Sequence, residues 1–193
     1  MITNSKYRDA FKKFHALNTV KAVIFGLTAS LPPVLYPVLC KLMGMTWQVL
    51  RTSSARKELK YQVVNVQSDR EMDSAIVAHV KHALSSYRSE DHVIAFCHTK
   101  HQAHALTKLF NVSPYHAVHQ DKELLEKNQE MKQKWLSGEN KVMVSTSLLG
   151  CGMDYPHICD VIYQNPSFSM LDQYQEDSRG GRDGWNAGWL HLL

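Results

Sequence analysis

The sequence lacks the features of a membrane protein, a disulfide-stapled protein or a zinc protein. It contains four cysteines in 193 residues and no Cys-x-x-Cys pair, which excludes a zinc knuckle of the usual spacing and favours reduced thiols. The apolar stretch 31–43 is too short for a membrane span and holds three prolines. Residues 1–13 are polar and charged, unlike a signal peptide. These absences predict a soluble, intracellular protein with no metal site of its own.

Two phosphate-handling signatures are also missing. The chain has no Gly-x-x-x-x-Gly-Lys-Thr/Ser loop, whose backbone amides would cradle nucleotide phosphates. It has no Asp-Glu-x-His sequence that could hold magnesium and orient water. The net charge is only +4, which suits a polyanionic partner without requiring one. We therefore expect no ATP hydrolysis by this chain acting alone.

Short apolar runs alternate with helical patterns from about residue 61 onward. Helix starts are predicted by capping boxes at Ser68 and Thr99 and by a cap at Asp121. Strands are predicted at 61–66, 92–97, 112–118, 141–145 and 161–163. Strands that alternate with helices in this way indicate βαβ units and a mainly parallel sheet with helices on both faces. The fold class is therefore α/β.

The amino-terminal part has a different pattern. The β-branched run 20–27 predicts a buried strand, and 46–50 a second short one. Pro32 and Pro33 fit the first turn of a helix. Residues 51–60 contain four basic residues and no apolar periodicity, which predicts a linker. We divide the chain into the end of one α/β lobe (1–50), this linker (51–60) and a second lobe (61–193).

Two arginines near the carboxyl terminus, Arg179 and Arg182, stand three residues apart with two glycines between them. On a helix or a tight helical turn they would project from one side. Guanidinium groups keep their charge and bind phosphate oxygens through a planar fork, so the pair could act as arginine fingers. Taken alone, the pair fits an ordinary salt-bridged helix face better.

The surrounding residues favour the first alternative through a family resemblance. Tyr174-Gln175-Glu176, followed by 179–184 (Arg-Gly-Gly-Arg-Asp-Gly), resembles motif VI of the RecQ-like superfamily 2 DNA helicases. Ser178 stands where that family prefers glycine. DEAD-box RNA helicases begin the motif with His-Arg, which is absent here. DNA is therefore the expected substrate.

Further segments resemble helicase motifs in the order of the family. Residues 27–30 resemble motif III, residues 93–100 motif IV, residues 115–117 the element after it, and residues 145–156 motif V. Each has a plainer alternative when taken alone: a helix cap for 28–30, a surface role for His116 and an ordinary turn for 150–152. Their shared order makes chance similarity a poor explanation.

The resemblance implies a RecA-like lobe of the P-loop NTPase type, preceded by a remnant of a first lobe, in a fragment of a 3′–5′ helicase. It implies ATP and magnesium as cofactors of the complete enzyme, with a missing amino-terminal lobe as one partner. The other partner would be single-stranded DNA, or duplex DNA with a single-stranded tail. The implied residues are Arg179 and Arg182 for catalysis, Gln175, Gly152 and Asp154 for the nucleotide, Lys100, His116 and Thr146 for DNA, and Thr28 and Ser30 for coupling.

Two other functions remain open at this stage. The chain could be a catalytically inactive module, derived from a helicase, that binds nucleic acid or a partner protein. It could also be a lobe of a DEAD-box-like RNA helicase, which Gln175 and Glu176 disfavour. The RecQ resemblance further implies DNA repair or recombination as the setting, and the nucleus in a eukaryote.

Overall fold

The computed structural model describes residues 13, 15–17, 19–28, 31–53, 55–86, 88–115, 121–146, 155–165, 167, 169–182 and 189–192. The chain divides into two compact units, unit 1 (Met1–Ala55) and unit 2 (Arg56–Leu193). Four predicted site residues lie outside the described part of the chain: Ser30, His116, Gly152 and Asp154. The assignment of 1–50 and 61–193 to two helicase lobes stays a prediction.

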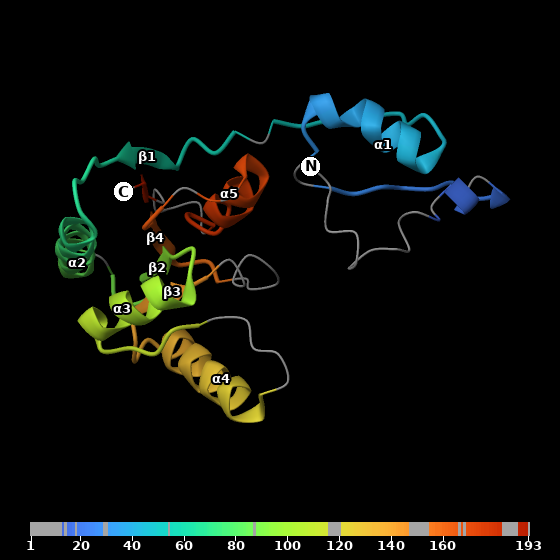
Figure 1. The fold of residues 1–193 in the computed structure, drawn as a ribbon. Helices are drawn as coiled ribbons and strands as arrows, with labels where there is room; N and C mark the ends of the chain where they lie inside the picture. Colours follow the sequence, from blue (N-terminus) through green and yellow to red (C-terminus); the bar gives the residue numbers. More distant parts are fainter. Residues whose placement is uncertain are drawn as a thin grey trace. The chain divides into compact units, whose positions relative to one another are not determined.

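Unit 2 contains a five-stranded, wholly parallel sheet (Figure 1). Its strands are β1 (Lys60–Val63), β2 (His92–Phe96), β3 (Val142–Ser145), β4 (Ile158–Tyr163) and β5 (Trp189–Leu192). They lie in the order β1-β5-β4-β2-β3. The predicted parallel α/β sheet is therefore confirmed. Residues 112–118 were predicted as a strand, and of these Tyr115 forms an isolated bridge to Ser145.

Four helices connect these strands, and local side-chain contacts explain where they begin. They are α2 (Asp69–Ser86), α3 (Lys100–Phe110), α4 (Lys122–Leu136) and α5 (Met170–Asp177). Thr99 and Gln102 form the predicted reciprocal capping box of α3. Asp121 accepts a hydrogen bond from the amide of Leu124 at 3.1 Å, and Ser68 accepts one from Glu71 at 3.2 Å. Both predicted caps are confirmed, because they satisfy amides that a helix start leaves open.

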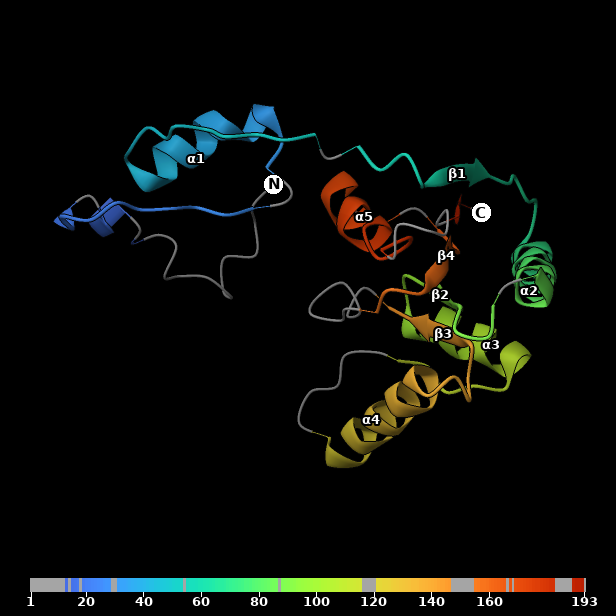
Figure 2. The same cartoon turned by 180° about the vertical axis from the view of Figure 1, so that it is seen from behind.

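The core fills both faces of the sheet. On one face, α2 and α3 contribute Ile76, Val80 and Leu106 to a buried cluster with alternate residues of β2 and β3. On the other face, Met131 and Trp135 of α4 pack with other apolar residues of those two strands and with apolar residues of β4. Figures 1 and 2 show α2 and α5 on opposite sides of the strands. Near-continuous apolar strands are typical of a parallel sheet covered on both faces.

In the described part of unit 1, the longest helical segment lies at 33–43. A 3₁₀ turn (Pro33–Leu35) leads into α1 (Tyr36–Met43), and Gly44 ends it at φ 64°. The helix predicted after Pro32 and Pro33 is therefore confirmed. Within the described residues, every helix of the chain is too short or too polar to cross a bilayer.

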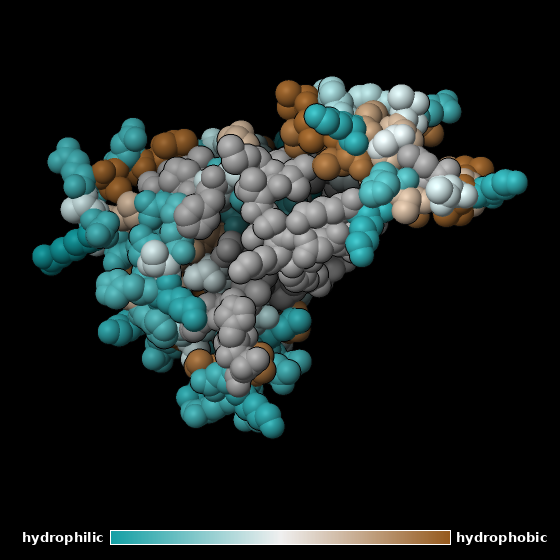
Figure 3. Space-filling view, turned by 45° about the vertical axis from the view of Figure 1, so that its right-hand side comes forward, coloured by the Kyte–Doolittle hydropathy of each residue, from teal (hydrophilic) through white to brown (hydrophobic). Residues whose placement is uncertain are grey.

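The strands predicted at 20–27 and 46–50 are wrong. Both stretches lack strand structure, and Val23, Phe25 and Leu27 are 80%, 84% and 97% exposed. A strand needs neighbours for its amides and carbonyls, and no described residue of unit 1 belongs to a strand. Figure 3 shows apolar side chains gathered on the surface of unit 1.

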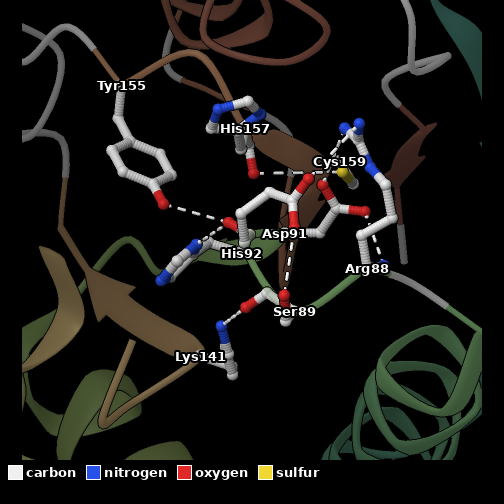
Figure 4. A network of polar contacts seen from close by, with 9 residues as sticks. Arg88, Ser89, Asp91, His92, Lys141, Tyr155, His157 and Cys159 are labelled. Carbon is white, nitrogen blue, oxygen red and sulfur yellow. Dashed lines mark hydrogen bonds and ion pairs between the residues drawn. The ribbon is translucent and has the colours of Figure 1, made fainter. Parts of the chain in front are cut away.

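A polar network holds the amino-terminal ends of β2 and β4 together (Figure 4). The Nδ1 atom of His92 donates to the carbonyl of Glu90 at 2.6 Å, and the hydroxyl of Tyr155 donates to the same oxygen at 2.9 Å. The His92 ring lies edge-on to Trp135 and Tyr155, with centroids 4.9 and 4.7 Å away. Its backbone amide bonds the carbonyl of His157 at 2.9 Å. His92 is therefore enclosed by aromatic rings.

This enclosure should make stability depend on pH. Burial lowers the pKa of His92, because desolvation disfavours the charged ring. The unfolded chain would take up a proton at about pH 6.5, where folded His92 stays neutral, so the free energy of unfolding should fall as the pH drops below that value. In urea titrations at about pH 7.5 and 5.5, we expect wild type to lose more stability than His92→Gln, by up to about 1.4 kcal/mol per pH unit.

The comparison of wild type with His92→Gln also controls for the other titrating groups of the protein. The buried carboxyls of Glu176 and Asp177 have raised pKa values, and they act in the opposite direction in both proteins, so their contribution cancels. Equal pH dependence in wild type and His92→Gln would show that His92 is not the titrating group.

Candidate functional site

The two motif-like arginines lie on a turn after α5, at the amino-terminal end of the sheet. In a parallel βαβ unit the helix returns the chain to the end where the next strand begins. The amide of Gly181 accordingly donates to the carbonyl of Ile158, the first residue of β4, at 2.9 Å. Gly181 has φ 62°, a conformation that favours glycine. The turn 178–182 is therefore fixed to the sheet through its backbone.

A side chain distant in the sequence also bonds this turn. The Nη2 atom of Arg56 donates to the carbonyls of Gly180 at 2.7 Å and Gly181 at 2.9 Å. Arg56 lies within the predicted linker 51–60, and its contact with the turn was not predicted. The sequence shows only that Arg56 is one of four basic residues within 51–60. No neighbouring residue indicates a contact with Gly180 or Gly181.

The two arginines differ in exposure. Arg179 is 5% exposed, whereas Arg182 is exposed and donates from Nε to the carbonyl of Ser178 at 2.9 Å. Of the two predicted settings, a helix or a tight helical turn, the structure has the turn, because α5 ends at Asp177 and both arginines follow it. Of the two arginines, Arg182 is therefore the one that solvent reaches.

Buried carboxylates secure the end of α5. The hydroxyl of Tyr163 donates to Asp177 Oδ1 at 2.7 Å, and the hydroxyl of Ser167 donates to Glu176. Desolvation raises the pKa of both carboxyls, and the nearby Arg179 opposes the rise at Glu176. Glu176 of the motif therefore anchors the helix, whereas Gln175 is exposed.

Two of the predicted DNA residues, Lys100 and Thr146, lie at the opposite, carboxyl-terminal end of the sheet. Lys100 begins α3 shortly after β2 ends, and Thr146 follows β3 directly. Because β2 and β3 are hydrogen-bonded neighbours, the structure brings these two residues to one edge. Lys100 is exposed, and the amide of Thr146 donates to Tyr115 at 3.3 Å. They are not part of the arginine turn. Thr28 belongs to unit 1.

The chemistry of the turn suits a phosphate better than a metal ion. An exposed guanidinium supported by fixed backbone can neutralise a phosphoryl oxygen. Among the described residues, no group of three His, Cys, Asp or Glu side chains could hold a metal ion, and Glu176 and Asp177 are buried and hydrogen-bonded.

Comparisons with known proteins connect this geometry to a family. The family model of the helicase conserved C-terminal domain matches residues 75–184. A candidate ATP-dependent DNA helicase Q1 of Caenorhabditis briggsae is 29% identical over 167 residues, covering 85% of this chain and 26% of that protein. The ATP-dependent DNA helicase RecQ of Bacillus subtilis is 26% identical over 180 residues, covering 92% and 29%. The chain thus spans little more than a quarter of these relatives.

A solved structure gives the same fold. Dbp5 of Saccharomyces cerevisiae, bound to RNA and ADP–BeF3, superposes with a TM-score of 0.68 at 18% identity, covering 86% of this chain and 44% of that one. At this identity the likeness concerns the fold alone, and it confirms the predicted RecA-like class. With the family match across more than half of the residues and the RecQ relatives along most of them, the chain belongs to the helicase conserved C-terminal domain family and is RecQ-like within it.

Proposed function

We propose that the chain provides the second RecA-like lobe of an ATP-dependent 3′–5′ DNA helicase. The observation that carries this proposal is the exposed Arg182 on a turn whose backbone is bonded to β4 and to Arg56. A fixed cation of this kind can neutralise charge that develops on a transferring phosphoryl group. Its direct test is the turnover of an Arg182 variant when a first lobe is supplied.

The remaining parts of the reaction would come from the first lobe. ATP with magnesium supplies the phosphoryl group and its charge neutralisation, and the phosphate-binding loop and metal ligands have no counterpart in this sequence. Gln175, Gly152 and Asp154 are proposed nucleotide contacts from this lobe. Arg179 is proposed to support Arg182 from within the protein, since it is buried. Thr28 and Ser30 are proposed to couple the nucleotide site to DNA.

DNA would bind at the carboxyl-terminal edge of the sheet through phosphate contacts. Lys100 and Thr146 lie there, and His116 is the third proposed contact. Such contacts position the strand without reading sequence. The names of the RecQ relatives favour DNA, whereas the likeness to Dbp5, a structure with bound RNA, is confined to the fold.

We expect Lys100→Ala to weaken binding of labelled single-stranded oligonucleotides of every sequence alike. It should also reduce the slope of log affinity against log salt by about 0.7, the value for one phosphate contact on a single strand. Lys108→Ala is a matched control, because Lys108 is exposed near the other end of the same helix. Equal losses for the two variants would contradict a local site. Tight binding to one sequence only would indicate a dedicated recognition module instead.

A further inference from the structure

Arg56 is the first residue of unit 2 and contacts the arginine turn from 124 positions away in the sequence. Its Nη2 atom donates to the two successive carbonyls of Gly180 and Gly181, at 2.7 and 2.9 Å. Its Nε atom is paired with the carboxylate of Glu58. One guanidinium thus bonds two turn carbonyls and an acid.

The position of this cation is electrostatically favourable. The carbonyls follow the carboxyl-terminal end of α5, where unsatisfied backbone oxygens and the helix dipole concentrate negative partial charge. Hydrogen bonds from a charged donor to such oxygens are stronger than those between neutral groups. The amide of Gly180 already donates to Asp177 at 3.1 Å. Arg56 therefore acts like a helix-capping residue, because it donates hydrogen bonds to carbonyl oxygens of the turn.

Arginine suits this place better than lysine. The two hydrogens of Nη2 serve the two carbonyls while Nε, on the same rigid plane, serves Glu58. The pKa of Glu58 is lowered, first by a hydrogen bond from its own backbone and then by Arg56. Lysine has a single nitrogen on a flexible stem, so it could reach the carbonyls but would not be held in plane by Glu58.

The backbone of Arg56 is itself fixed. Its carbonyl accepts from the amide of Leu59 at 3.2 Å, and Leu59 is buried in the core cluster that contains Tyr163. Ala55, its neighbour in the chain, is the last residue of unit 1.

We infer that Arg56 is a positioning residue for Arg182, and that its hydrogen bonds to Gly180 and Gly181 set the geometry of the arginine turn. This inference rests on the proposed function of Arg182 in phosphoryl transfer. Arg56 touches neither nucleotide nor DNA in this mechanism. It acts by holding the carbonyls that precede Arg182, so that the guanidinium of Arg182 is presented in one orientation.

The first test uses the 193-residue chain and does not depend on catalysis. Hydrogen exchange at the amide of Gly181, which bonds the carbonyl of Ile158, should be about tenfold faster in Arg56→Met, as expected when local opening becomes easier. Arg56→Lys should show partial protection. Lys57→Met is the matched control, because Lys57 is the exposed neighbour in sequence, and it should exchange as wild type. Wild-type exchange at the turn in Arg56→Met would overturn the inference.

The second test measures ATP turnover with a RecQ-type first lobe fused ahead of the chain. Arg56→Met should lower kcat by about 10- to 100-fold, the scale of a displaced catalytic group, with little change in KM for ATP. Arg56→Lys should recover part of kcat, a rescue that lost stability alone would not produce. Unchanged kcat in Arg56→Met, in an enzyme that Arg182→Ala inactivates, would overturn the inference and leave the proposed function intact. Normal turnover in Arg182→Ala would reject the proposed function itself.

Discussion

Replacing Arg182 by alanine is expected to cut ATP turnover by about 10³-fold, the scale of a lost arginine finger, once a RecQ-type first lobe is supplied. The side chain is exposed and its backbone is fixed by Gly181 and Ile158, so its removal should take away a cation without disturbing the fold. Affinity for ATP should change little, because the finger acts mainly on charge that develops during transfer. Steady-state kinetics with an ATP-binding measurement separate the two effects.

Two further variants sharpen this experiment. Arg182→Lys should recover little activity, since lysine lacks the planar fork. Arg70→Ala is the matched control, because Arg70 is an exposed arginine on α2, and it should retain wild-type turnover. An Arg182→Ala enzyme with ordinary turnover would assign Arg182 to a structural role, like that of any arginine bonded to a nearby carbonyl.

The largest effect on stability is expected at Trp135. This side chain is 0% exposed and packs against the rings of His92 and Tyr155, with centroids 4.9 Å away in each case. Trp135→Ala would leave a cavity beneath the sheet, and losses of about 3–5 kcal/mol are typical of such truncations. Urea denaturation followed by circular dichroism would measure the change.

Leu125→Ala provides the control on the same helix. Leu125 is 44% exposed, so its truncation should change the free energy of unfolding by no more than about 0.5 kcal/mol. Comparable losses in the two variants would mean that α4 does not face the sheet through Trp135. Of Leu124, Leu125, Met131 and Trp135 on α4, only the last two are buried.

Predictions that depended on local chemistry were the most successful. The capping residues Thr99 and Asp121 act through atoms three positions away, so their roles can be inferred from neighbouring residues. The buried strands β2, β3 and β4 were also found, because strands covered on both faces must be apolar throughout. The run 20–27 has the same composition, and it was misjudged because composition does not say whether a pairing partner exists.

Contacts between distant segments could not be predicted. Nothing near Arg56 in the sequence indicates that its guanidinium bonds Gly180 and Gly181. The difference between buried Arg179 and exposed Arg182 likewise depends on how the turn meets β4. The strand β5 was not predicted. The resemblance identified the two arginines, but only the fold shows that one is buried and the other exposed.

The pairing of β1 with β5 has a consequence for the order in which unit 2 folds. Lys60 pairs with Trp189, so the first and last strands of the unit meet across nearly its whole length. Closing a loop is entropically unfavourable, and each doubling of its length adds about 0.6 kcal/mol. The three strands β4, β2 and β3 are closer in sequence and already share a core. They should assemble first, and because β1 joins the sheet through β5, the segment that carries Arg56 should reach its final place last.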